Sequence, residues 1–282
     1  MGRCVRWWND DERTFGKDST GSPRIHCISN LVSANDTANI LLAMGAKPIL
    51  AQAEQETQEI AGVCNAVVLN CGTPELSRFR AMEEAGKGAL KADRPVILDP
   101  VGAGASSWRM CQIKDLLEAV YPTVIHCNYS ECCALLGEKT RLCGVDSISG
   151  EQQERRKAAE ALARKYRCVV LVSGPKDVIA DREKAGVISG GSRMMGMVTG
   201  TGCMLSAMIG AFCAVCEDSF SAAATASSYW KACAEAAEKW TEQEGGGPGM
   251  LHWKLMDAAY LLKDWRENVE IFGKTITAVC GN

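Results

Sequence analysis

The sequence has no long basic run and no long apolar segment. No cluster of Lys and Arg extends beyond a few residues, and the net charge is -3. Nothing in the chain is therefore suited to neutralising a nucleic-acid backbone. The longest uncharged apolar stretch, Cys203 to Cys216, is shorter than the roughly 20 residues that a membrane-spanning helix needs. We expect a soluble protein that binds neither nucleic acid nor membrane.

The cysteines lack the pattern of a disulfide framework or a zinc site. Cys64, Cys71, Cys168 and Cys213 lie inside apolar runs of a long chain, and we see no signal peptide. Cys213-Ala-Val-Cys216 has no partner pair at a usable spacing for zinc. We expect reduced core cysteines in a cytoplasmic protein.

Length and composition favour one globular unit. The chain has 282 residues, of which 47% are hydrophobic, and this is enough to bury a large core. Residues 1–22 are polar and aperiodic apart from Trp7 and Trp8, so we expect a loosely ordered arm there. Residues 23–282 are predicted to form a single domain.

Short apolar runs alternate with helical patterns through the middle of the chain. Continuous apolar runs of this length are typical of strands that are covered on both faces. The expected strands lie at residues 48–51, 66–70, 95–99, 123–128 and 168–173. This alternation predicts an α/β fold with a mostly parallel central sheet.

Caps and breakers place the remaining elements. Thr73, Pro74 and Glu75 predict the start of a helix that runs to about Lys91. An antiparallel hairpin is expected from residues 177–181 and 186–189, with its turn at residues 184–186. Further helices are expected at about residues 35–45, 151–166 and 220–243, and from the breaker at residues 245–249 to about residue 266.

Four of the expected strands end in a polar residue: Asn70, Asp99, Asn128 and Ser173. Parallel strands bring their carboxyl ends to one edge of a sheet, and ligands of open α/β sheets bind outside that edge. These four residues therefore mark the predicted edge of the site.

A glycine-rich turn, Val198-Thr-Gly-Thr-Gly-Cys203, leads directly into the most apolar helical segment. The first amides of such a helix are unpaired and lie at the positive end of its dipole. They form an anion hole, and phosphate is the anion we expect. The alternative is that Gly200 and Gly202 only allow a tight connection between strand and helix.

Several motifs together resemble the hydroxyethylthiazole kinase family of thiamine biosynthesis. They lie at residues 25–30, 39–48, 98–105 (Leu-Asp-Pro-Val-Gly-Ala-Gly-Ala), 128–131 (Asn-x-x-Glu) and 198–203, and the likeness runs from about residue 24 to residue 266. The resemblance implies a ribokinase-like fold with helices on both faces of the sheet. It further implies ATP-dependent phosphorylation of the hydroxyl of 4-methyl-5-(2-hydroxyethyl)thiazole, Mg²⁺ as cofactor, and a homotrimer with active sites at subunit interfaces.

Asp99 and Glu131 are the candidate metal ligands, because magnesium prefers carboxylate sites and keeps several waters. Glu131 has an alternative role as a first-turn acid of a helix, and Asn128 as a side-chain cap. Cys203 stands where related sugar kinases are expected to carry an aspartate. We expect Cys203 to act as a weak base or positioning group beside the amides of Gly200 and Gly202, and a helix N-terminus favours a thiolate.

The resemblance also places the binding residues. It assigns Leu50, Gly200 and Asn30 to the thiazole, and His126, Ser173 and Asn128 to ATP. The family usually has Arg-Gly-Asn where this chain has His126-Cys127-Asn128. Histidine provides no permanent bidentate fork for phosphate, so we expect ATP to bind more weakly, or more strongly at low pH if His126 is protonated. The alternative is a neutral histidine that only fills the site.

Two other functions stay open from the sequence. One is another ribokinase-like kinase of small alcohols, although those usually have an aspartate at position 203. The other is a thiazole- or nucleotide-binding homologue without catalysis, which the absent arginine favours.

Overall fold

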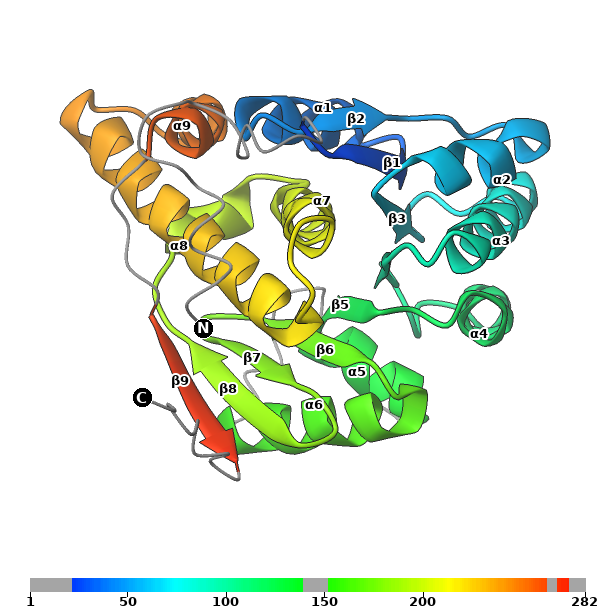
Figure 1. Ribbon diagram of the computed structural model, residues 1–282. Coiled ribbons are helices and arrows are strands. Elements are labelled where there is room, and N and C mark those ends of the chain that lie inside the picture. The colour runs from blue at the N-terminus through cyan, green and yellow to red at the C-terminus, as the bar shows by residue number, and fades with distance from the viewer. Residues whose placement is uncertain (1–21, 139–151, 263–267, 274–282) are drawn as a thin grey trace, which may run out of the picture.

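A nine-stranded sheet runs through the protein (Figure 1). The computed structural model describes residues 22–138, 152–262 and 268–273. The strand order is β2-β1-β3-β4-β5-β6-β7-β8-β9, in which the first six strands are parallel and the last three antiparallel. The strands are β1 (Arg24–Ile28), β2 (Lys47–Ile49), β3 (Ala66–Asn70), β4 (Val96–Asp99), β5 (Val124–Asn128), β6 (Val169–Ser173), β7 (Asp177–Ala180), β8 (Lys184–Ile188) and β9 (Val269–Gly273).

Helices cover both faces of this sheet, as expected (Figure 1). One buried core joins a face of the sheet to α1 (Ala34–Ala43), α7 (Thr201–Cys213), α8 (Ser219–Gln243) and α9 (Pro248–Leu261). The other core joins the opposite face to α2 (Glu54–Val63), α3 (Leu76–Lys91), α4 (Ser107–Val120), α5 (Tyr129–Leu136) and α6 (Gln152–Tyr166). A short 3-10 helix, η2 (Arg193–Met197), precedes α7. The prediction of an α/β fold with a mostly parallel sheet is confirmed.

The five predicted strands are present as β2 to β6, but β1 and β9 were not predicted as strands. β1 has the sequence Arg-Ile-His-Cys-Ile, in which polar side chains interrupt the apolar run. His26 is nevertheless fully buried, and its Nε2 lies 2.8 Å from the carbonyl oxygen of Ala51. A polar residue with one backbone partner therefore occupies a position that sequence pattern alone assigns to an apolar side chain.

The helices α2 and α4 were also missed, and the start predicted for α3 is wrong. α3 begins at Leu76 instead of near Thr73. Thr73 has a φ of 42°, and its Oγ1 accepts hydrogen bonds from the amide of Leu31 (3.1 Å) and from Arg78 Nη1 (2.8 Å). The threonine thus joins two loops at the edge of the sheet, and Glu75 precedes α3 without a side-chain cap.

The predicted hairpin is confirmed as β7 and β8, which extend the sheet beyond β6. Its turn lies earlier than expected. Asp181 Oδ1 accepts hydrogen bonds from the amides of Glu183 and Lys184, both at 2.8 Å, so the aspartate side chain closes the turn and β8 already begins at Lys184. The last helix also differs from its prediction, because Pro248 opens α9 and the helix ends at Leu261.

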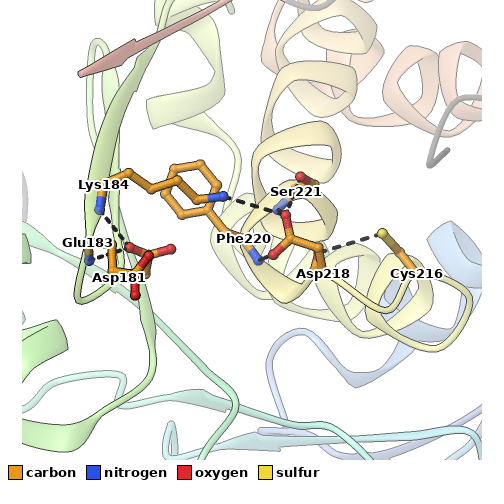
Figure 2. A network of polar contacts seen from close by, with 7 residues as sticks. All are labelled: Asp181, Glu183, Lys184, Cys216, Asp218, Phe220 and Ser221. Atoms are coloured by element: carbon orange, nitrogen blue, oxygen red, sulfur yellow. Dashed lines mark hydrogen bonds and ion pairs between the residues drawn. The ribbon is translucent and has the colours of Figure 1, made fainter. Parts of the chain in front are cut away.

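The hairpin is tied to the start of α8 (Figure 2). Lys184 Nζ lies 3.6 Å from Asp218 Oδ2 and 4.3 Å from the ring centre of Phe220. The Asp218 carboxylate caps α8 by accepting hydrogen bonds from the amides of Phe220 and Ser221. One lysine therefore contacts both a helix cap and the first aromatic side chain of that helix.

A buried ion pair connects the first strand of the hairpin, β7, to α8. Lys231 Nζ lies 3.1 Å from Asp177 Oδ1, and the two side chains are 9% and 5% exposed. The same carboxylate accepts hydrogen bonds from Ser227 Oγ (2.7 Å) and from the amide of Gly174 (2.9 Å). Asp177 thus connects the start of β7, the end of β6 and the middle of α8.

The structure bears on three other expectations. Cys64, Cys71, Cys168 and Cys213 are free and buried, as predicted, but Cys216 is disulfide-bonded, so the expectation of reduced cysteines is wrong for that residue. The expected N-terminal arm lies outside the described residues except for Ser22. Within the described residues, no helix combines the length and apolar character needed to cross a membrane.

Candidate active site at the carboxyl edge of the sheet

The parallel strands bring their polar terminal residues to one edge, as predicted. Asn70 of β3 is in register with Asp99 of β4. Asn128 of β5 is in register with Ser173 of β6. The edge therefore presents two amides, a hydroxyl and a carboxylate outside the carboxyl ends of four adjacent strands, where ligands of such sheets bind.

Helix α7 begins beside this edge. Gly200 is its N-cap residue with a φ of 84°, a left-handed conformation that favours glycine. A Cβ atom at this position would also lie 3.1 Å from Cβ of Ser33. The carbonyl of Gly200 accepts the hydrogen bond from Met204 N (2.9 Å), so the amides of Thr201 to Cys203 precede the first hydrogen bond within the helix. They stand at the positive end of the helix dipole.

The Asp99 carboxylate lies in a buried polar cluster next to these amides. Its Oδ2 accepts hydrogen bonds from Asn70 Nδ2 (2.7 Å) and Ser206 Oγ (2.8 Å). Asn30 Nδ2 donates to Asn70 Oδ1 at 2.9 Å. Both amide groups also point toward Cys203 Sγ, with Asn30 Nδ2 at 3.3 Å and Asn70 Nδ2 at 3.2 Å. Residues of β3, β4, α7 and the loop after β1 thus form one network.

Burial sets the protonation of this cluster. Burial, together with repulsion from Glu131, raises the pKa of the Asp99 carboxyl to about 8. Burial, together with the neighbouring Asp99, raises the pKa of the Cys203 thiol to about 11. The expected thiolate at the start of the helix is therefore not supported, because loss of solvent outweighs the hydrogen bonds and the dipole. Cys203 is a neutral thiol at physiological pH.

A second cluster lies at the start of α5. Asn128 and Glu131 form a capping box, in which Asn128 Oδ1 accepts from the amide of Glu131 and Glu131 Oε2 accepts from the amide of Asn128, both at 2.9 Å. Glu131 Oε1 also accepts a hydrogen bond from the amide of Gly102 (2.8 Å). The cap and first-turn roles considered from the sequence are therefore both present. They also hold the Glu131 carboxylate against the turn that follows Asp99.

Asp99 and Glu131 are the residues that could hold a magnesium ion at this edge. Both are buried, and neither forms an ion pair among the described residues. Burial raises the pKa of Glu131 as well, although the charge of the nearby Arg109 acts in the opposite direction, so the fold disfavours the charged form of both carboxyl groups. Each Glu131 oxygen accepts one amide and retains a lone pair. Within the described residues, no three or more His, Cys, Asp and Glu side chains are grouped so that they could hold a metal ion by themselves. Two carboxylates with waters and phosphate oxygens are what Mg²⁺ requires.

The predicted nucleotide residues have different surroundings. His126 is buried, its Nδ1 lies 2.7 Å from Ser206 Oγ, and burial lowers the pKa of the imidazole to about 4. It is therefore neutral at pH 7 and provides no charge for phosphate. Ser173 Oγ lies 3.4 Å from the carbonyl oxygen of Cys127, so its hydroxyl makes only a long contact within the protein. Leu50 is half-buried just after β2 and packs against the core that the sheet forms with α1, α7, α8 and α9.

Ser206 was not identified from the sequence. It connects the Asp99 carboxylate to His126 from one helical turn after Gly202, whose carbonyl also lies 3.2 Å from its hydroxyl oxygen. The available signal was a single hydroxyl in the apolar run of α7, three residues after Cys203. On a helix this spacing places both side chains on the same face.

Comparisons with known proteins agree on one family. The model described as "Hydroxyethylthiazole kinase family" matches residues 17–264. Hydroxyethylthiazole kinase of Oleidesulfovibrio alaskensis is 40% identical over 254 residues, which are 89% of this chain and 94% of the relative. The enzyme of Pyrococcus furiosus is 38% identical over 240 residues, with 85% and 88% covered.

Solved structures agree as well. A hydroxyethylthiazole kinase protein from Pyrococcus horikoshii OT3 superimposes with a TM-score of 0.79 at 35% identity, covering 89% of this chain and 94% of that chain. Pyridoxal kinase from Staphylococcus aureus, in complex with AMP-PCP and pyridoxal, has a TM-score of 0.60 at 15% identity, with 90% and 100% covered. The second likeness is one of fold.

Proposed function

The chain belongs to the hydroxyethylthiazole kinase family, and we propose that it phosphorylates its substrate at the sheet edge beside the start of α7. The reaction transfers the terminal phosphoryl group of ATP to the hydroxyl of 4-methyl-5-(2-hydroxyethyl)thiazole, giving the thiazole phosphate and ADP in thiamine biosynthesis or salvage. The observation that carries the proposal is the family match together with the left-handed turn at Gly200, which opens the amides of α7 beside Asp99.

The start of α7 is the proposed cradle for the transferred group. Phosphoryl transfer passes through a loose transition state, so the protein mainly positions groups and balances charge. The amides that follow Gly200, including that of Gly202, are oriented donors at a helix N-terminus. They stabilise the charge on the phosphoryl oxygens without having to reorganise during the reaction.

Asp99 and Glu131 are the proposed ligands of hydrated Mg²⁺. When bound, the ion neutralises phosphate charge. The surrounding protein orients the carboxylates beforehand, since Asn70 and Ser206 hold Asp99 while the amide of Gly102 holds Glu131. Asp99 is linked to α7 through Ser206, and Glu131 lies in the first turn of α5, which supports a shared role at this edge.

The thiazole is proposed to bind near Asn30, Leu50 and Gly200. Leu50 supplies apolar surface at the end of β2, and Asn30 lies within reach of the thiol of Cys203. The substrate hydroxyl then lies beside Cys203. Because the thiol is neutral, Cys203 serves mainly as a positioning group for that hydroxyl, and little activation is needed.

Replacement of Cys203 by alanine is expected to lower kcat by less than about 100-fold, below the loss typical for removal of a general base. The pH profile of the wild type should show no inflection from this thiol between pH 6 and 9, since the pKa of Cys203 is about 11. Cys203→Ser, which keeps a hydrogen-bonding group, serves as the matched control. Unchanged turnover of Cys203→Ala excludes any base role, and a loss beyond 100-fold contradicts the positioning role.

His126, Ser173 and Asn128 are the proposed contacts of the ATP side of the site. Ser173 Oγ is available as a donor, and Asn128 is fixed by its capping box. A neutral His126 contributes a hydrogen bond to Ser206. The change in ATP affinity expected from its protonation would fall near pH 4 instead of in the physiological range.

Release of ADP measured with a panel of alcohols tests the function. We expect ADP to form with hydroxyethylthiazole and not with pyridoxal or a hydroxymethylpyrimidine. ADP formation with one of the other alcohols selects a different kinase of this fold. Binding of thiazole and ATP without turnover selects a non-catalytic homologue.

We also infer a cytoplasmic homotrimer with active sites between subunits. The buried free thiols support a reducing compartment, while the disulfide at Cys216 counts against it. Leu31 and Val32, next to Asn30, are 69% and 60% exposed, and apolar side chains at such exposure suit a subunit contact. A mass measured by light scattering distinguishes a trimer from other assemblies.

A further inference from the structure

Three cationic side chains are buried among the described residues: Arg78, Arg155 and Lys231. Arg78 Nη1 donates to the carbonyl oxygen of Thr73 (2.8 Å), and Lys231 pairs with Asp177 (3.1 Å). Arg155, in the first turn of α6, is 9% exposed and has no hydrogen bond or ion pair with any described residue. Its Nε atom is buried without a partner.

A buried guanidinium without a partner lowers the stability of the folded protein. Burial of a charge without a partner is strongly unfavourable. Among the described residues, the guanidinium has a cation–π contact with the ring of Tyr129, whose centre lies 5.9 Å from Arg155 Cζ, and such a contact offsets only part of that cost. The surroundings of Arg155 therefore favour the binding of an anion to its guanidinium.

The guanidinium lies at the edge where the strands end. Tyr129 directly follows Asn128 at the end of β5, and Gly174 directly follows Ser173 at the end of β6. A Cβ atom at Gly174 would lie only 1.6 Å from Arg155 Nη1, so the absence of a side chain there makes room for the guanidinium. Arg155 reaches this edge from α6, on the sheet face opposite α7.

We propose that Arg155 binds the phosphate chain of the nucleotide at the ends of β5 and β6. A guanidinium donates paired hydrogen bonds to phosphate oxygens and keeps its charge at all working pH values. Ser173, Asn128 and the neutral His126 at this edge carry no positive charge. Lys231 Nζ lies 3.4 Å from the carbonyl oxygen of Gly174, but this lysine is already paired with Asp177. This inference rests on the proposed function, because it takes ATP as the anion that enters the site.

The first test compares nucleotides that differ only in their phosphates. We expect Arg155→Gln to weaken binding of ATP, measured by calorimetry, about 10-fold or more, as for loss of a charged hydrogen bond. Binding of adenosine and the KM for thiazole should not change. Arg155→Lys should fall between wild type and Arg155→Gln, because lysine keeps the charge without the fork. Arg156→Gln, on the same helix but paired with Glu160 at the surface, is the matched control.

A second variant displaces the guanidinium of Arg155 but leaves Arg155 itself unchanged. Gly174→Ala places a methyl group where Arg155 Nη1 lies, and it keeps the backbone bonds of Gly174 to Asp177 and Lys231. We expect this variant to weaken ATP binding as Arg155→Gln does, with no added effect when the two are combined.

Unchanged affinity for ATP in Arg155→Gln overturns the proposal. So does an equal loss for adenosine and ATP, because this would indicate that Arg155 only supports Tyr129. If the wild type binds ATP but releases no ADP with thiazole, the proposed activity fails while the role of Arg155 in binding is still tested. A wild type that binds no ATP overturns both.

Discussion

Replacement of Asp99 by asparagine is expected to lower kcat about 100- to 1,000-fold, the loss typical for removal of one preorganised electrostatic group. Asparagine has the same shape and can still accept hydrogen bonds from Asn70 and Ser206 through its oxygen. It removes the negative charge that we propose as a ligand of Mg²⁺. The expected result is an enzyme that binds thiazole normally and turns over very slowly at saturating ATP and Mg²⁺.

Stability separates this loss of chemistry from a loss of folding. The pKa of Asp99 is raised to about 8 by burial and by Glu131, so the fold disfavours the charged form. A neutral amide should therefore leave the melting temperature unchanged or higher. Asp115→Asn, an exposed carboxylate on α4, is the control and should keep full activity. A kcat of Asp99→Asn within 10-fold of wild type would remove Asp99 from the proposed site.

Replacement of Asp177 by alanine is expected to lower the free energy of unfolding by about 3–5 kcal/mol, the cost of breaking a buried ion pair by removal of one partner. Lys231 would stay buried without its counter-charge, while Ser227 and the amide of Gly174 would lose their acceptor. Urea unfolding followed by circular dichroism measures the change.

Two further variants show whether the uncompensated charge is the cause. Asp177→Leu combined with Lys231→Met removes both charges and should recover much of the loss. Glu160→Gln breaks the surface pair with Arg156 and should leave the free energy of unfolding nearly unchanged. If Asp177→Ala alone is as stable as wild type, the pair does not hold the hairpin to α8.

The sequence predicted the strands that are apolar throughout and the edge where they end. Continuous apolar runs such as those of β3 and β6 are compatible with few other secondary structures, because a fully covered strand needs apolar side chains on both faces. The glycine-rich turn before α7 was predicted as well, although the sequence did not indicate which of its two glycines is left-handed. Local signals were sufficient for these elements.

Other elements depend on partners far away in the chain. β1 contains a buried histidine that is acceptable only because the carbonyl of Ala51 lies beside it. Thr73 resembles a helix cap, yet its hydroxyl contacts Leu31 and Arg78 across the edge. Neither contact is visible in a local pattern, because tertiary hydrogen bonds overrode the local preference.

The same reason explains what was missed in the site. The positions of Asp99, Glu131 and Cys203 followed from motifs, but the protonation of Cys203 did not. Its thiol is surrounded by amides and a buried carboxylate, and this environment depends on how four elements pack. The isolation of Arg155 was also invisible, because the absence of a partner appears only once the side chains around it are placed.

The position of β9 in the sheet affects how β8 is covered while the chain is being synthesised. β9 comes from residues 269–273 and pairs along the whole length of β8, so β8 is interior only after the last part of the chain has docked. During synthesis on the ribosome, β8 emerges long before its neighbour and presents an open row of backbone donors and acceptors. A shortened product that stops before residue 268 would keep that row, and such products would tend to self-associate.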